Sequence, residues 1–131
     1  MGDGHHPYLQ VGKLVAWLDA LPAACAAARE SGRRVLLVHG RATCGGTRAL
    51  VEKTIAKEEI AEFLNRHFVA VASDADHPSA EVEALLAQLP RREPTPVCAY
   101  LGADGRLLHS TAGGRPPAVF LNDLTDATRK K

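Results

Sequence analysis

One short segment of the chain carries the residue types that could do chemistry. Residues 39 to 47 read HGRATCGGT and directly follow the apolar run of residues 35 to 38. A strand that leads into a glycine-rich loop and then a helix presents backbone N–H groups to a ligand. Three interpretations fit such a segment: a phosphate site made by its glycines, a thiol site at Cys44, or a simple turn.

The phosphate interpretation fails on one residue. The segment fits the pattern GxxxxGx[ST], but Gly46 stands where a nucleotide-binding P-loop has its lysine. Without that cation nothing compensates the charge of the β- and γ-phosphates, and no other strand offers a clear metal-binding aspartate. We therefore exclude nucleotide hydrolysis.

The thiol interpretation uses the same loop. Cys44 is expected at the N-terminus of a helix, where unpaired N–H groups and the helix dipole stabilise a thiolate. Gly45 and Gly46 allow the backbone to approach a partner closely. Arg41 and Arg48 flank the loop and could favour a thiolate or hold a carboxylate, although charges beside loops are more often simply solvated. The pattern predicts a lowered pKa for Cys44.

The other cysteines and the histidines predict neither a disulfide framework nor a metal site. Cys25, Cys44 and Cys98 are an odd number at wide spacing, and the six histidines show no metal-binding pattern. We expect Cys25 and Cys98 to be buried structural thiols. His39 ends the predicted central strand, and we expect its ring to lie within reach of Cys44.

Composition describes one ordinary domain. A chain of 131 residues that is 46% hydrophobic and 24% charged can bury a core without disulfides or metal. The net charge is +1 and basic residues cluster only at positions 129 to 131, so nucleic-acid binding is not indicated. No apolar stretch approaches the roughly 18 to 20 residues of a membrane span, and the N-terminus lacks a signal-peptide pattern. We expect a cytoplasmic monomer that does not bind membranes.

Periodicity and helix breakers predict an α/β domain. Strands joined by a helix should be parallel with a right-handed crossover, and a closing hairpin must be antiparallel. We therefore expect a central mixed sheet with a parallel βαβ half, an antiparallel hairpin and helices on both faces. The domain should span residues 15–131, behind a flexible N-terminal arm of residues 1–14. The expected helices cover residues 22–31, 47–56, 57–67, 79–89 and 116–128, and the expected strands cover residues 34–39, 68–72, 97–101 and 106–110.

The order and spacing of these segments resemble the thioredoxin superfamily, in particular the small thioredoxin-like proteins related to thiol:disulfide interchange domains. The resemblance extends over roughly residues 17 to 128 and implies a thioredoxin-like fold with redox chemistry at Cys44. It also implies that Pro96 follows a cis peptide bond and that Thr95 offers backbone groups to an extended peptide or to glutathione. The segments that carry it are AAARESGRRVLLV, KEEIAEFLNRHFVAVASDAD, Thr95-Pro96, GADGR and Ala112-Gly113-Gly114.

The chain departs from this family at the active-site motif. The family usually carries WCxxC, whereas Thr43 replaces the tryptophan here and Thr47 replaces the second cysteine. A dithiol enzyme uses its second thiol to resolve the mixed disulfide, so ordinary dithiol turnover cannot run within this motif. Thr47 could instead donate its hydroxyl to the Cys44 sulfur or cap the helix.

Three hypotheses therefore remain open. In the first, Cys44 is a monothiol that forms a mixed disulfide with glutathione or a protein thiol, as in glutaredoxins that carry CxxS. In the second, Cys98 is an unconventional resolving thiol, because it lies two residues after Pro96. Val97 and Cys98 face opposite sides of their strand, and the sequence does not decide which faces the loop. In the third, the domain is a redox-inactive module that binds peptides.

The first hypothesis is our leading prediction. Cys44 would be the nucleophile, and the N–H groups of Gly46 and Thr47 would stabilise its thiolate. Thr95 and Pro96 would position the substrate. No metal and no resident cofactor is expected, with glutathione entering only as a reaction partner.

Overall fold

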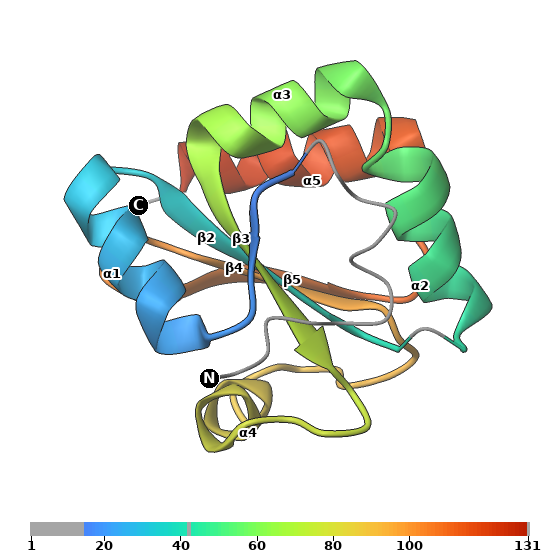
Figure 1. The fold of residues 1–131 in the computed structure, drawn as a ribbon, viewed down its shortest axis with the longest axis horizontal. Coiled ribbons are helices and arrows are strands. Elements are labelled where there is room, and N and C mark those ends of the chain that lie inside the picture. Colours follow the sequence, from blue (N-terminus) through green and yellow to red (C-terminus); the bar gives the residue numbers. More distant parts are fainter. Residues whose placement is uncertain (1–14, 42, 131) are drawn as a thin grey trace.

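The computed structural model describes residues 15–41 and 43–130, so the predicted N-terminal arm lies outside the described residues. These residues form a five-stranded mixed sheet with the strand order β1-β3-β2-β4-β5 (Figure 1). The first three strands in this order are parallel, whereas β4 runs antiparallel to β2 and β5 antiparallel to β4. The strands are β1 (Trp17–Leu18), β2 (Arg34–Gly40), β3 (Phe68–Asp74), β4 (Val97–Leu101) and β5 (Leu107–Ala112). The helices are α1 (Leu21–Ser31), α2 (Gly45–Ala49), the π-helical turn η2 (Leu50–Thr54), α3 (Glu58–His67), α4 (Ala80–Leu86) and α5 (Pro117–Arg129).

Helices cover both faces of the sheet (Figure 1). Leu36 and Val38 of β2 belong to a core cluster that includes residues of η2, α3 and α5. Val35 and Leu37 alternate with them and pack in a second cluster with α1 and α4. Because β2 is buried on both faces, it reads as a continuous apolar run rather than an alternating one. The predicted mixed sheet with a parallel half, an antiparallel hairpin and helices on both faces is confirmed.

Local signals set most helix boundaries. Pro22 stands in the first turn of α1, and Gly32 ends that helix with a φ of 74° in the left-handed region. Lys57 is the N-cap of α3, which agrees with the break predicted near that residue. Ser79 caps α4 by accepting a hydrogen bond from the N–H of Val82 at 3.2 Å.

Two elements differ from the sequence prediction. The expected helix over residues 47–56 begins earlier, at Gly45, and continues as the π-helical turn η2. Trp17 and Leu18, for which the sequence predicts no strand, form an edge strand that pairs with Ala70 and Val71 of β3. A two-residue strand is too short to show a periodic pattern, so its existence depends on the ladder that β3 offers.

The end of β2 packs tightly against α2. Gly40 is the last residue of β2, and a Cβ atom placed there would collide with the Oγ1 and Cγ2 atoms of Thr47. Its carbonyl accepts a hydrogen bond from the N–H of Ala75 at 2.8 Å. The absence of a side chain at Gly40 therefore lets the first turn of α2 lie directly over the strand end.

We expect Gly40→Ala to destabilise the protein by about 1–3 kcal/mol, because the new methyl group overpacks the fully buried Thr47. The matched control is Gly45→Ala, since a Cβ atom there has no neighbour within 4 Å. The control should change the free energy of unfolding by less than about 0.5 kcal/mol. Urea unfolding followed by the fluorescence of Trp17 measures both, and equal stability of the two variants would contradict this packing.

Candidate functional site

Cys44 lies at the start of α2, where the sequence placed it. It is the N-cap residue of that helix, with extended backbone angles of φ −86° and ψ 121°. Its N–H donates to the carbonyl of Arg41 at 3.0 Å, and its carbonyl accepts from the N–H of Arg48 at 3.0 Å. The thiol is half-buried. A tight turn after β2 thus presents this sulfur at the helix N-terminus.

The sulfur of Cys44 is surrounded by hydrogen-bond donors. The hydroxyl of Thr95 donates to Sγ at 3.2 Å, and the protonated thiol donates to the Thr95 carbonyl at 3.4 Å. Burial alone would raise the pKa of the Cys44 thiol, but hydrogen bonds from the Thr95 hydroxyl and from Thr47 and Gly46 outweigh it and lower the pKa from 9.0 to about 7. The thiolate is therefore populated at neutral pH.

The segment that holds Thr95 lies directly against α2. The peptide bonds before Pro94 and Pro96 are both cis. A Cβ atom on Gly46 would lie 3.1 Å from Cδ of Pro96 and 3.3 Å from the Thr95 carbonyl oxygen. The N–H of Gly113 donates to the carbonyls of Pro94 and Pro96 at 2.8 and 3.0 Å. The turn after β5 and the glycine in α2 therefore hold Thr95 in contact with the sulfur.

Thr47 is completely buried under the loop. Its hydroxyl accepts a hydrogen bond from the N–H of Arg41 at 3.4 Å and also contributes to the lowered pKa of Cys44. Thr47 is the third residue of α2 rather than its N-cap, so of its two predicted roles the structure supports the one toward the sulfur. Gly45 is exposed and has open space around it.

Cys98 lies in the core. It is 0% exposed and packs in the cluster beneath α5, together with Tyr100 and Phe120. Val97 faces the opposite cluster, beneath α1 and α4. Burial raises the pKa of Cys98 to about 12, so this thiol stays protonated at neutral pH.

Cys25 was expected to be buried, but it is only half-buried. Ala24 and Ala28 take the fully buried face of α1, which leaves Cys25 at its margin. Burial still raises the pKa of the Cys25 thiol. The three cysteines therefore have different environments, and only that of Cys44 favours a thiolate.

The ring of His39 is bound to strand β3. Its Nδ1 forms a hydrogen bond with the hydroxyl of Ser73 at 2.9 Å, and burial lowers the pKa of its ring. Among the described residues, the groups that shift the Cys44 pKa do not include His39. His39 instead lines a hollow that it shares with Thr95.

The sequence missed one contact at the sulfur. The resemblance assigned Thr95 a role through its backbone, whereas the structure also places its hydroxyl on Cys44. The signal available was a threonine directly before Pro96, which does not reveal a partner 51 residues away. Arg48, which flanks the loop, pairs with Glu52 at 3.1 Å one turn along the helix.

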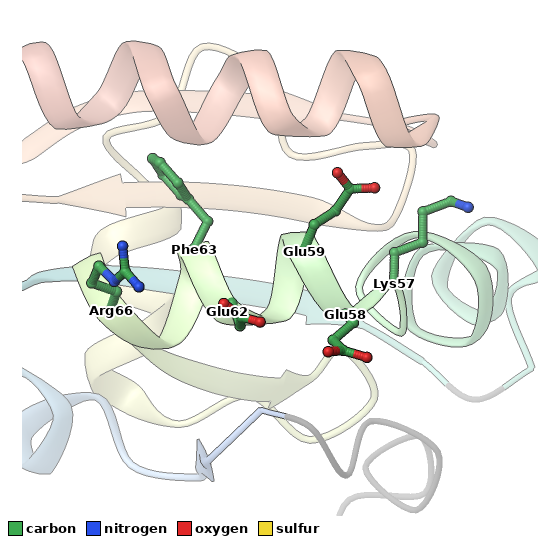
Figure 2. A pocket seen from close by; sticks show the side chains of 6 residues that line it. All are labelled: Lys57, Glu58, Glu59, Glu62, Phe63 and Arg66. Carbon is green, nitrogen blue, oxygen red and sulfur yellow. The ribbon is translucent and has the colours of Figure 1, made fainter.

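Two hollows of about 400 Å³ adjoin the Cys44 loop. One is mainly apolar and lies between α2, η2 and residues 114 to 117, with Gly46 in its wall. The other is polar and contains His39, Arg41 and Thr95. A larger hollow of about 590 Å³ runs along α3, where Phe63 points toward α5 and the other lining residues are charged (Figure 2). None of its lining residues comes from the Cys44 loop or the Thr95 segment.

Within residues 15–41 and 43–130, no group of three or more histidine, cysteine, aspartate or glutamate side chains could hold a metal ion. In the same part of the chain, no helix is both long and apolar enough to span a bilayer.

Comparison with family models gives a match over the part of the chain that contains this site. A family model described as thioredoxin-like matches residues 16–103, which include the Cys44 loop and the Thr95 segment. No curated protein sequence matches the chain at a significant level. The family match therefore covers the whole parallel half of the sheet and strand β4.

Solved structures share the fold at low sequence identity. A thioredoxin from Thermus thermophilus has a TM-score of 0.72 at 22% identity, covering 87% of each chain. A disulphide isomerase from Xylella fastidiosa has a TM-score of 0.69 at 22% identity, covering 82% of this chain and 88% of the other. A thioredoxin-fold protein from Helicobacter pylori has a TM-score of 0.65 at 16% identity, covering 89% of this chain and 78% of the other. The fold is thioredoxin-like, and several of the structures it resembles are those of thiol oxidoreductases.

The lowered pKa of Cys44 predicts how its alkylation depends on pH. The thiolate is the reactive form, so the rate with iodoacetamide should rise with pH through a midpoint near 7. Thr95→Val removes the hydroxyl donor and should move the midpoint up by about one pH unit. Thr95→Ser keeps a hydroxyl and should leave it near the wild-type value.

Peptide mapping after alkylation follows the three cysteines separately. Cys98 should remain unmodified in the folded protein because it is buried and its pKa is about 12. A wild-type midpoint for Cys44 at 8.5 or above would show that the hydrogen bonds at its sulfur do not stabilise the thiolate.

Proposed function

Since the chain belongs to the thioredoxin-like family, we propose that it carries out thiol–disulfide exchange with Cys44 as its only reacting thiol. The observation that carries the proposal is the environment of the Cys44 thiol. This thiol is half-buried, its sulfur accepts a hydrogen bond from the Thr95 hydroxyl, and its pKa is lowered to about 7. A thiolate near neutral pH is the form that attacks disulfides. We propose that the protein acts as a monomer.

The reaction has two exchange steps. The Cys44 thiolate attacks one sulfur of a disulfide R–S–S–R′, so that one S–S bond breaks and the Cys44–S–S–R bond forms. The R′ thiolate leaves and takes a proton from water. A thiolate from a second molecule then attacks the mixed disulfide, forms a disulfide with R and releases the Cys44 thiolate. In sum, one external thiol replaces R′ in the disulfide, R′ leaves as a thiol, and Cys44 is regenerated; a second external thiol would then be needed to release R as a thiol.

The hydrogen bonds at Cys44 assist both steps. Donors that lower the pKa of a thiol populate its thiolate at neutral pH, which speeds the first attack. The same donors make Cys44 a better leaving group in the second step, because a thiol of lower pKa leaves faster. The Thr95 hydroxyl thus acts on the sulfur of Cys44, while the packing of Pro96 against Gly46 keeps Thr95 in place.

An external thiol must resolve the mixed disulfide. Thr47 has no sulfur, and Cys98 is fully buried with a pKa of about 12. We therefore propose glutathione or a protein thiol as the second reactant. A reducing cytoplasm would supply such thiols, and we propose it as the place of action.

A second candidate function rests on the residues that replace the family motif. Thr43 and Thr47 stand where the tryptophan and the second cysteine would be, which favours a module that binds peptides along the Thr95 segment without redox work. The two functions differ at Cys44. Binding of a peptide would survive Cys44→Ser and weaken in Thr95→Arg, whereas exchange chemistry would be lost in the first variant.

Cys44→Ser should abolish mixed-disulfide formation with glutathione disulfide, because the only accessible thiol of low pKa is removed. Cys98→Ala is the matched control and should still form the adduct, as it removes a buried thiol. Intact-protein mass spectrometry at pH 7 measures the added glutathionyl group. An adduct of normal yield in Cys44→Ser would assign the chemistry to another cysteine.

Thr47→Cys should create a second active-site thiol. The Thr47 side chain already contacts the Cys44 sulfur, so a cysteine there should form an intramolecular disulfide with Cys44 on mild oxidation. In a single turnover without external thiol, the pre-reduced variant should release a model protein in its reduced form, whereas the wild type should stop at the mixed disulfide. Failure of the two cysteines to form a disulfide would show that the loop does not have the spacing of a dithiol site.

A further inference from the structure

A polar hollow lies beside Thr95, the residue whose hydroxyl contacts the Cys44 sulfur. It has a volume of about 400 Å³, within the usual range for small-molecule sites. Thr95 lines it and also contacts the Cys44 sulfur at 3.2 Å. Arg41 lines it as well, and its carbonyl accepts a hydrogen bond from the N–H of Cys44. A group attached to the Cys44 sulfur can therefore reach this hollow, which we call the arginine hollow.

Two guanidinium groups lie in the lining of the arginine hollow. Arg41 pairs with Asp76 through Nε at 2.9 Å, and Arg92 pairs with Glu83 through one Nη nitrogen at 2.7 Å. Each pair is partly exposed and uses one of the three nitrogens of its guanidinium. The remaining N–H donors are available to a carboxylate, which a guanidinium group commonly binds through two parallel hydrogen bonds.

Besides the two arginines, the lining includes a histidine ring, a threonine hydroxyl and one carboxylate. His39 is 6% exposed, is held through Nδ1 by Ser73, and has no partner at Nε2 among the described residues. Glu93 adds a carboxylate to the lining. The hollow can therefore bind a carboxylate at its arginines and an ammonium group at Glu93, a combination found on small amino-acid-derived thiols.

We propose that the arginine hollow binds a carboxylate of a small amino-acid-derived thiol compound, with glutathione as the type, while the sulfur of that compound exchanges with Cys44. The inference rests on the proposed function and assigns the class of its disulfide substrate. In the exchange, the Cys44 thiolate takes one glutathionyl group, the S–S bond of glutathione disulfide breaks, and glutathione thiolate leaves to be protonated by water. The arginines act by positioning the substrate.

The test compares disulfides that differ in charge. Rates of adduct formation at Cys44 are measured by mass spectrometry with anionic glutathione disulfide, neutral 2-hydroxyethyl disulfide and cationic cystamine. Wild-type protein should prefer glutathione disulfide over the other two. Arg41→Gln combined with Arg92→Gln should slow the glutathione reaction about tenfold and leave the neutral disulfide unchanged. Arg41→Lys combined with Arg92→Lys should recover part of the preference.

The matched control is Arg66→Gln combined with Arg129→Gln, which removes the same two positive charges from exposed positions on α3 and α5 and should change no rate. Circular dichroism and thermal unfolding confirm that each variant is folded. If the double Gln variant slows all three disulfides equally, or none of them, the arginine hollow is not a carboxylate site, while the proposed exchange function stands.

Two other outcomes also overturn the inference. A wild-type protein that reacts with none of the disulfides removes the proposed function and the inference with it. A disulfide-linked acidic octapeptide serves as the second source of carboxylate. If the Gln substitutions slow this peptide more than glutathione disulfide, the arginines recognise extended acidic peptides rather than a small thiol compound.

Discussion

The close approach of α2 to the Thr95 segment is the contact on which the rest of the site depends. Strands β2 and β4 are neighbours and antiparallel, with His39 paired to Val97, so the end of one strand and the start of the other meet at the same edge of the sheet. The loop after β2 and the segment before β4 are therefore brought together from positions 51 residues apart. Gly46 allows α2 and the Thr95 segment to approach this closely, because a larger residue there would be crowded by Pro96.

That contact decides how cysteines in the same small protein differ chemically. Cys44 meets the Thr95 hydroxyl and the N–H groups of the helix start, and its pKa falls to about 7. Cys98 lies under α5 in an apolar cluster, and burial raises its pKa to about 12. The difference arises because a thiolate needs donors that replace the water it loses. Its position at the start of α2, rather than burial in the sheet, lowers the pKa of Cys44.

The loop holds Thr47 where a dithiol motif would place its second cysteine. Thr47 is fully buried, lies against Gly40 and accepts a hydrogen bond from the N–H of Arg41. It therefore fills the position beside Cys44 as a packing and hydrogen-bonding residue. The loop lacks a second thiol that could complete the exchange. The arginine hollow beside Arg41 leaves space for a thiol compound from solution. The proposed chemistry and the proposed substrate class both follow from this arrangement.

The sequence by itself determined most of the elements and the position of Cys44 directly before a helix. The buried run of β2, the breakers Pro22 and Gly32, and the glycines after Cys44 are local signals, and periodicity needs no distant partner to be read. Only the tertiary structure decided that Trp17 joins the sheet, that Cys98 faces the core beneath α5, and that the Thr95 hydroxyl rests on the Cys44 sulfur. These outcomes depend on strand order and on which face each side chain takes, and both are set by packing between segments far apart in the chain.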